Sequence, residues 1–320
     1  MVFCDYNGYF AGRTVLVTGG AGFIGSHLTQ HLAELDCDVR VLDDFSSGYR
    51  KNLKGIDATI TEGSIIDNNN LSFAFDGCSV VFHLAAMVSV PLSIEEPEKC
   101  FEINVQGTKN VVDAATRTGC NRVVFASSAA CYGPNPSLPS SEADRTFPKS
   151  PYAQSKLDAE LIIANATSVD CNSGVSGVSL RYFNVFGEKQ DPKSQYAAVV
   201  TAFSEAIKKS KSPVIYGDGN QTRDFVHVNN IVHANLLAAS HPKRFCGEVY
   251  NVGTGKQTSL LELLSIMSND DVHNATHFEG RAGDVRHSCA DLTSITKKIG
   301  YQPIENTAQR LLDLVNPKQH

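Results

Sequence analysis

The sequence lacks tryptophan, and no apolar run in it reaches the roughly 18 residues that a membrane-spanning helix requires. Its first residues, MVFCDYNGYFAGR, show no basic segment followed by an apolar stretch, so we expect no secretory signal peptide. The formal net charge of −6 provides no broad basic surface, so neither nucleic acid nor a membrane is an expected partner. An anionic ligand would have to be held by individual arginines and by helix ends.

The nine cysteines are odd in number, scattered along the chain and never spaced as C-x-x-C. This pattern indicates neither a disulfide framework nor a zinc site, and we expect no metal. A reducing compartment, the cytoplasm, is the expected location. The composition, 42% hydrophobic and 19% charged, is typical of a globular protein with one large or two smaller domains.

The segment Thr14–Gly25, TVLVTGGAGFIG, carries the strongest signal in the chain. A β-branched strand over Thr14–Thr18 is followed by three glycines spaced G-x-x-G-x-x-G and then by a helical pattern. In this order the first glycine permits a tight turn, the second admits a pyrophosphate to the backbone, and the third lets the helix pack on the strand. These glycines are Gly19, Gly22 and Gly25. A second expected strand, Asp38–Leu42, leads to Asp43, where a ribose-binding carboxylate belongs.

Residues 12–183 alternate apolar strands with helical patterns. This alternation predicts an α/β fold, a Rossmann-like doubly wound parallel sheet with helices on both faces and ligands at the carboxyl ends of the strands. The expected strands are 14–18, 38–42, 58–61, 79–84, 122–127 and 178–183, and the expected helices are 23–35, 95–117 and 150–166. The pattern then becomes mixed and loop-rich, with helices expected at 196–209, 229–240 and 259–267 and strands at 214–216 and 248–251. We therefore expect a dinucleotide-binding domain over 1–183, with sheet contributions from later segments, and a smaller, interleaved mixed α/β domain over 184–320.

Tyr152 and Lys156 stand one helical turn apart on one face of an expected helix. A nearby ammonium, together with an oxidised nicotinamide, would lower the tyrosine pKa from its usual value near 10 and let the phenolate take a proton. Ser128 follows an expected strand, RVVFAS, and could hydrogen-bond the same reacting hydroxyl. Taken alone, the pair could be an exposed helix pair and the serine a turn cap. Together with the glycine motif, the three residues indicate a catalytic site.

These motifs resemble the extended short-chain dehydrogenase/reductase superfamily, in its NAD-dependent nucleotide-sugar epimerase/dehydratase branch. The resemblance covers almost the whole chain. The matching segments are TGGAGFIG (18–25), LDDFSSG (42–48), HLAA (83–86), NVQGT (104–108), SSAACYG (127–133), PYAQSK (151–156), RYFNVFG (181–187), TRDFVHV (222–228), YNVGTG (250–255) and RAGDVRHS (281–288).

The resemblance implies that NAD is the cofactor and that Ser128, Tyr152 and Lys156 are catalytic. A carboxylate at Asp43 disfavours the 2′-phosphate of NADP. The implied cofactor contacts are Gly19, Gly22, Phe23, Ile24, Gly25, Asp43, Ser64, Ile65, Leu84, Ala85, Ala86, Asn104, Tyr152 and Lys156. Ser64 departs from the family pattern, because a carboxylate usually stands there near the adenine.

The second half is similar to UDP-N-acetylhexosamine 4-epimerases, closest to UDP-N-acetylglucosamine 4-epimerase, and this implies a UDP-sugar-binding domain. The implied substrate contacts are Ser89, Ser128, Asn184, Tyr216, Arg223, Arg281, Asp284 and Ser288. Guanidinium groups suit bidentate phosphate binding, although a lone arginine such as Arg223 could instead form a surface ion pair with Asp224. At Ser288 the family places a residue that gates the sugar pocket, and a small side chain leaves room for a 2-N-acetyl group.

The segment after Ser128 distinguishes between the reactions of this branch. Related 4,6-dehydratases and uronate decarboxylases usually carry an acid just after the strand-end serine or threonine, whereas Ser128 is followed here by Ala129. Dehydration therefore lacks its proton donor, and 4-epimerisation needs none. We expect a UDP-hexose 4-epimerase acting on UDP-GlcNAc/UDP-GalNAc, and also on UDP-Glc/UDP-Gal if the pocket is broad. The alternatives are a UDP-glucose or UDP-glucuronate 4-epimerase, a UDP-uronate decarboxylase, or a non-catalytic NAD-binding sensor. A homodimer is expected, as in relatives.

Overall fold

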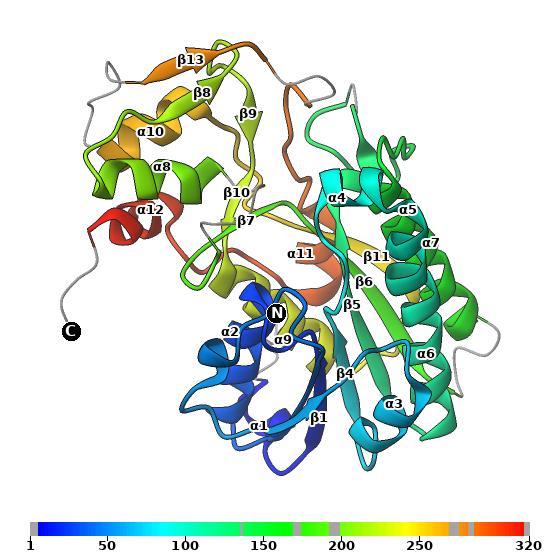
Figure 1. The fold of residues 1–320 in the computed structure, drawn as a ribbon. Coiled ribbons are helices and arrows are strands. Elements are labelled where there is room, and N and C mark those ends of the chain that lie inside the picture. Colours follow the sequence, from blue (N-terminus) through cyan, green and yellow to red (C-terminus); the bar gives the residue numbers. More distant parts are fainter. Residues whose placement is uncertain are drawn as a thin grey trace.

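A seven-stranded sheet forms the centre of the molecule (Figure 1). The computed structural model describes residues 6–134, 137–168, 174–191, 199–268, 275–280 and 285–316. The strand order is β11-β6-β5-β4-β1-β2-β3, and every neighbouring pair is parallel. The strands are β1 (Thr14–Thr18), β2 (Asp38–Asp43), β3 (Thr59–Glu62), β4 (Val80–His83), β5 (Arg122–Ser128), β6 (Ser176–Tyr182) and β11 (Cys246–Val252). The predicted parallel sheet is confirmed.

Helices cover both faces of this sheet, as predicted (Figure 1). One layer contains α1 (Asn7–Phe10), α2 (Phe23–Ala33), α9 (Val228–Ser240) and α11 (Thr293–Ile299). The other contains α3 (Asn68–Ala74), α4 (Val90–Glu95), α5 (Pro97–Phe101), α6 (Gly107–Arg117) and α7 (Pro151–Ser168). Because both faces are covered, strands such as β4 are buried along their whole length, which explains their continuous apolar sequence.

The single long helix expected over 95–117 is wrong in detail. The structure divides this stretch into α5, a wide turn of π-helix η2 (Glu102–Gln106), and α6. A π-turn inserts an extra residue into a helix, and the side-chain pattern does not reveal it. Short 3-10 helices η1 (Arg50–Leu53) and η3 (Ala129–Tyr132) follow β2 and β5.

A smaller lobe stands beyond the carboxyl edge of the sheet and has its own apolar core (Figure 1). It contains α8 (Val199–Lys208), β8 (Val214–Tyr216), α10 (Leu260–Ser268), β13 (Thr276–Phe278) and α12 (Thr307–Val315). The short strands β7 (Asn184–Phe186) and β10 (Phe225–His227) pair with each other, as do β9 (Thr222–Arg223) and β12 (Thr258–Ser259). The chain re-enters the main sheet layers through α9, β11 and α11, so the two parts are interleaved.

No helix among the described residues is long and apolar enough to span a bilayer. Among the described cysteines, Cys246 is disulfide-bonded. The other cysteines in the described part of the chain are free thiols, so its partner lies outside the described residues. Disulfides are uncommon in the reducing cytosol. One bonded cysteine among the described residues is not a framework of disulfides, so the prediction that the cysteines form no such framework is not contradicted.

Candidate active site

The glycine-rich turn joins β1 to α2 at the carboxyl edge of the sheet. Gly19 has a φ of +72°, which residues with side chains rarely adopt. A Cβ on Gly19 would lie 2.7 Å from the backbone N of Ala85, and one on Gly25 would lie 2.1 Å from the Gly19 carbonyl oxygen. Gly22 is the N-cap of α2 and supplies no capping side chain, so the first-turn N–H groups can face an anion. The turn therefore fits a pyrophosphate. Phe23 and Ile24 form the first turn of α2, where contact with this ligand was predicted.

Asp43 is the last residue of β2 and is buried beside this turn. Its Oδ2 accepts a hydrogen bond from the N–H of Ala21 at 2.8 Å, and its Oδ1 accepts one from the N–H of Phe45 at 2.8 Å. Burial raises the pKa of Asp43, and the two backbone bonds act in the opposite direction. A carboxylate has about four acceptor positions, so capacity remains for ribose hydroxyls.

Ser128, Tyr152 and Lys156 meet where β5 ends against the first turns of α7. The Ser128 hydroxyl lies near the Tyr152 phenol, and its interaction with the phenol acts to lower the tyrosine pKa. The Lys156 Nζ donates to the Ala126 carbonyl oxygen at 2.8 Å and lies 6.0 Å from the centroid of the Tyr152 ring. The sequence-predicted catalytic residues are thus brought together.

The protonation of this group is dominated by burial. Burial raises the pKa of Tyr152 to about 12 against the effect of Ser128, and lowers the pKa of Lys156 from 10.5 to about 8. We expected the Lys156 ammonium to favour the phenolate. In this structure burial outweighs that effect, because the ammonium bonds to the Ala126 carbonyl and not to the phenol.

Residues 15–253 match the NAD dependent epimerase/dehydratase family. The chain belongs to this family. It is 36% identical over 299 residues to the UDP-glucose 4-epimerase of Mycolicibacterium smegmatis, covering 90% of this chain and 93% of that protein. The solved UDP-N-acetylglucosamine 4-epimerase from Methanobrevibacter ruminantium M1, in complex with UDP-N-acetylmuramic acid, is 37% identical with a TM-score of 0.89, covering 96% of this chain and 98% of that one. The UDP-glucose 4-epimerase from Thermotoga maritima, solved with UDP-glucose, is 34% identical with a TM-score of 0.88, covering 95% of this chain and 98% of that one.

NAD is the cofactor of the NAD dependent epimerase/dehydratase family, and the residues present here fit it. The glycine turn leaves space that a Cβ would fill, and Asp43 stands beside it at the end of the next strand. The segment Leu84–Ala86 follows β4 and lies against the turn, because the Leu84 N–H donates to the Thr18 carbonyl at 3.1 Å and the Ala85 N–H donates to the Thr18 hydroxyl at 3.3 Å. Leu84 and Ala85 thus lie beside the turn, and contact of Leu84, Ala85 and Ala86 with NAD remains a prediction.

Three further residues of the predicted cofactor set act inside the protein. Asn104, in η2, donates to the Met87 carbonyl at 3.0 Å and to the Ser155 hydroxyl at 2.9 Å, so it joins the segment after β4 to α7. Ser64 accepts a hydrogen bond from the N–H of Ile66 at 3.2 Å within its own turn. Ile65 is 4% exposed and belongs to the apolar core.

A buried ion pair behind the catalytic residues was missed by the sequence analysis. Glu160 lies one turn after Lys156 on α7, and its carboxylate accepts two hydrogen bonds from Arg181 of β6, at 2.9 Å to Nε and 2.7 Å to Nη2. The Ser127 hydroxyl donates to the same carboxylate. The four-residue step from Lys156 to Glu160 was a visible signal, but its partners become apparent only from the sheet order.

A second buried group connects β1 and β4 to η2 and α6. His83 lies between the hydroxyls of Thr18, at 2.8 Å from Nδ1, and Thr108, at 2.9 Å from Nε2. The Thr108 hydroxyl donates in turn to the Asn104 carbonyl at 2.6 Å. Burial lowers the pKa of His83 to about 3, so the imidazole is neutral and acts through hydrogen bonds.

Three of the predicted substrate residues, Asn184, Arg223 and Ser288, lie around β7 and β9. The Asn184 N–H donates to the Asp224 carbonyl at 3.0 Å, the Arg223 guanidinium donates to the Thr222 carbonyl at 2.8 Å, and the Ser288 N–H donates to the same carbonyl at 3.1 Å. Tyr216 packs against a neighbouring aromatic ring on β13. Ser89 caps α4 through its hydroxyl. Arg281 and Asp284 lie outside the described residues.

Asp224 holds two of the loops in this region together. Its fully buried carboxylate accepts hydrogen bonds from the Thr254 N–H and hydroxyl, at 2.8 and 2.6 Å, from the Gly255 N–H at 2.9 Å, and from the Ala290 N–H at 3.1 Å. The alternative of a surface ion pair between Arg223 and Asp224 is therefore wrong, because this carboxylate faces the interior. Asp224 instead fixes the backbone on either side of the substrate residues.

Proposed function

We propose that this protein catalyses the reversible C4 epimerisation of a UDP-hexose, with UDP-GlcNAc and UDP-GalNAc as the main pair and UDP-Glc and UDP-Gal as further substrates. The observation that carries the proposal is the convergence of Ser128, Tyr152 and Lys156 beside the glycine turn in a member of this family. Relatives named as UDP-glucose and UDP-N-acetylglucosamine 4-epimerases support the reaction class.

The three side chains have distinct roles at the sugar O4. When bound, NAD supplies a hydride acceptor that takes hydrogen from C4 and returns it to the opposite face, by way of a transient 4-keto sugar. Tyr152 removes the proton from the 4-hydroxyl and later returns it. Ser128 hydrogen-bonds both the phenol and the sugar oxygen. Lys156, fixed by the Ala126 carbonyl, provides positive charge one turn along α7, which offsets the cost of forming a buried phenolate.

The UDP part of the substrate is assigned to the smaller lobe. Arg223 and Arg281 suit the diphosphate, and Asn184 and Tyr216 are proposed as further contacts, Tyr216 to the base. Ser288 is small and bonds through its N–H to the strand that carries Arg223, so we infer a pocket that admits a 2-N-acetyl group. The remaining proposed substrate contacts are Ser89, Ser128 and Asp284.

Particular residues argue for or against each alternative function. Ala129 follows Ser128, so a uronate decarboxylase or a dehydratase would lack the acid that family members with those activities usually carry. The Thermotoga maritima relative solved with UDP-glucose supports a preference for that sugar as the second candidate, with UDP-glucuronate as a further 4-epimerase substrate. A non-catalytic NAD sensor would not require Tyr152 and Lys156 to converge with Ser128.

We also propose a homodimer formed through the helical layer that contains α6 and α7. Leu161 on α7 is 56% exposed although apolar, and it lies in a helix that packs against α6. Light scattering should give twice the chain mass if this surface pairs. A cytoplasmic location remains a prediction.

The decisive experiment uses purified protein without added NAD. UDP-GlcNAc and UDP-Glc are incubated separately, and their anomeric proton signals are followed by NMR. Appearance of UDP-GalNAc supports both the epimerase and the open pocket. Conversion of UDP-Glc alone keeps the mechanism and refutes the argument from Ser288. No conversion of either sugar, with NAD⁺ added, refutes 4-epimerisation of both and favours a uronate substrate or the sensor.

A further inference from the structure

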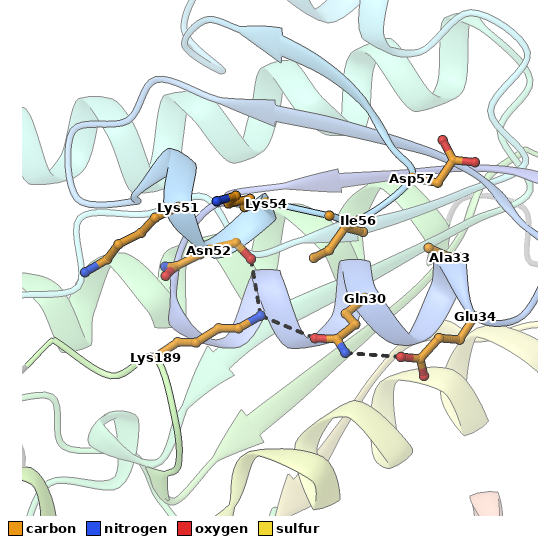
Figure 2. Close-up of a pocket in the computed structure, with 10 residues that line it drawn as sticks. Gln30, Ala33, Glu34, Lys51, Asn52, Lys54, Ile56, Asp57 and Lys189 are labelled. Atoms are coloured by element: carbon orange, nitrogen blue, oxygen red, sulfur yellow. Dashed lines mark hydrogen bonds between the residues drawn. The ribbon is translucent and has the colours of Figure 1, made fainter. Parts of the chain in front are cut away.

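A turn after β7, residues 187–191, reaches from the smaller lobe to the NAD-binding half of the molecule. His27 Nε2 on α2 lies 2.9 Å from the Glu188 carbonyl oxygen. The Lys189 Nζ donates to the Asn52 carbonyl oxygen at 3.2 Å and to Gln30 Oε1 at 3.4 Å (Figure 2). These bonds connect one turn to both α2 and η1.

A fourth bond extends this connection to the residue just before η1. The Tyr49 hydroxyl donates to Asp191 Oδ2 at 2.6 Å. Tyr49 is partly exposed, so the bond fixes a ring that apolar packing alone would leave poorly held. The turn therefore grips the 49–52 segment at two points, through Asp191 and through Lys189.

The backbone of the turn is conformationally unfavourable. Gly187 has a φ of +157° and Lys189 a φ of +62°. A residue with a side chain adopts the left-handed region only at an energetic cost, and it persists there when its surroundings hold it. The hydrogen bonds from the Lys189 side chain to Asn52 and Gln30 help to hold Lys189 in this conformation.

The segment that the turn grips covers the predicted ribose site. A Cβ on Gly48 would lie 3.0 Å from Asp43 Oδ1 and 2.9 Å from the Cβ of Ala21. The segment therefore lies directly on Asp43 and the glycine turn. The Tyr49 N–H and the Asn52 side-chain amide both donate to the Ala21 carbonyl, at 3.1 and 2.9 Å. Ala21 belongs to the glycine turn and is bonded to Asp43 through its own N–H. A shift of 48–52 would therefore disturb both halves of the dinucleotide site.

Apolar packing supports this segment on one side only. A cavity of about 460 Å³ lies between residues 51–57 and the C-terminal half of α2, and Lys189 stretches along it to reach Gln30 and Asn52 (Figure 2). The apolar cluster beneath the segment is small, consisting of Ala21, Val41 and Leu53 with a few partly buried neighbours. Hydrogen bonds from the 187–191 turn therefore restrain residues 49–52 where apolar packing does not.

We propose that Lys189 and the Tyr49–Asp191 bond are positioning contacts that retain NAD, by holding residues 48–52 closed over the ribose site. NAD that is regenerated in each catalytic cycle does not need to leave, so a slow release keeps the enzyme active without free cofactor. The turn comes from the smaller lobe, so it joins cofactor retention to the part of the chain assigned to substrate. The proposal requires NAD binding and is independent of which UDP-sugar is the substrate.

The test compares Tyr49→Phe, Lys189→Met and the double variant with wild type. Tyr49→Phe keeps the ring and removes only the hydroxyl. Lys54→Met is the matched control, because Lys54 lines the same cavity and its side chain makes no hydrogen bond to the described residues. Each protein is loaded with NAD, and the rate at which isotopically labelled NAD replaces the bound cofactor is measured by mass spectrometry.

We expect the exchange rate to rise about fivefold in each single variant and about 25-fold in the double variant, because each substitution removes part of the restraint on residues 48–52 and independent effects add in free energy. Lys54→Met should match wild type, and turnover at saturating NAD should stay within about twofold in all variants. Exchange in the double variant equal to that in Lys54→Met would overturn the proposal. A fall in turnover at saturating NAD without faster exchange would also overturn it, because the contacts would then serve the reaction and not retention. If Lys189→Met does not fold, Lys189→Gly, which accommodates the φ of +62°, makes the same test.

Discussion

Replacing Glu160 with glutamine should unfold the protein more readily while barely changing its shape. The carboxylate and the Arg181 guanidinium are 4% and 5% exposed, and they are joined by two charge-assisted hydrogen bonds. Glutamine keeps the volume but removes the negative charge, and its NH₂ group would face an N–H donor of Arg181. Tyr132, whose ring lies 4.7 Å from the guanidinium carbon, cannot replace the lost charge.

The expected loss follows from leaving a buried cation without its partner. Such a change costs about 3–5 kcal/mol, far more than an intact buried pair contributes relative to apolar residues. At roughly 2–4 °C per kcal/mol for a larger domain, the melting temperature should fall by about 6–20 °C. The double variant Glu160→Gln/Arg181→Met removes both charges and should be less destabilised than Glu160→Gln alone.

Thermal unfolding followed by calorimetry and circular dichroism measures this effect. Asp113→Asn is the control, because Asp113 pairs with Lys109 on an exposed surface and should melt close to wild type. A Glu160→Gln variant that melts like Asp113→Asn would refute the reasoning, since the carboxylate would then not be needed to balance Arg181. A double variant less stable than the single variant would refute it as well.

Three other substitutions test the site directly. Tyr152→Phe should abolish sugar turnover while NAD stays bound, and an active variant would remove Tyr152 from its proposed role. Because burial lowers the pKa of Lys156 from 10.5 to about 8, the unfolded chain binds the extra proton between these values. The wild-type free energy of unfolding should therefore rise with pH across this window relative to Lys156→Met, and parallel curves in urea titrations would contradict this. Ser288→Tyr should lose UDP-GlcNAc turnover and keep UDP-Glc turnover in the NMR assay, whereas equal losses would contradict a gate at this residue.

Local sequence patterns were sufficient for the elements that surround the cofactor. The strand before Gly19, the helix after it and the strand ending at Asp43 are each specified by a short periodic pattern and by glycine chemistry, and the structure contains all three. The proximity of Ser128, Tyr152 and Lys156 could also be predicted, because Tyr152 and Lys156 share a helix face and Ser128 ends a strand.

Features that depend on contacts between segments distant in the sequence could not be predicted from local patterns. Glu160 contacts both Arg181 and Ser127 because β5 and β6 are neighbouring strands. Residue spacing in the sequence does not predict which strands are neighbours. Burial makes the pKa of Tyr152 rise, and burial is a property of the assembled site. The π-helical turn η2 does not interrupt the helical pattern of apolar residues. The sequence therefore predicted one continuous helix and gave no sign of the extra residue.

The late return of the chain to its main sheet has a consequence for synthesis on the ribosome. β6 is buried along its whole length in the finished protein, and its outer edge is covered only by β11. The entire stretch from 183 to 245 must emerge before that cover exists, which takes several seconds at about 5–20 residues per second. During this interval an apolar strand with unpaired N–H and C=O groups is open to pairing with another nascent chain. We therefore expect a chaperone that shields this half-built sheet, or faster elongation between residues 183 and 245, to raise the soluble yield.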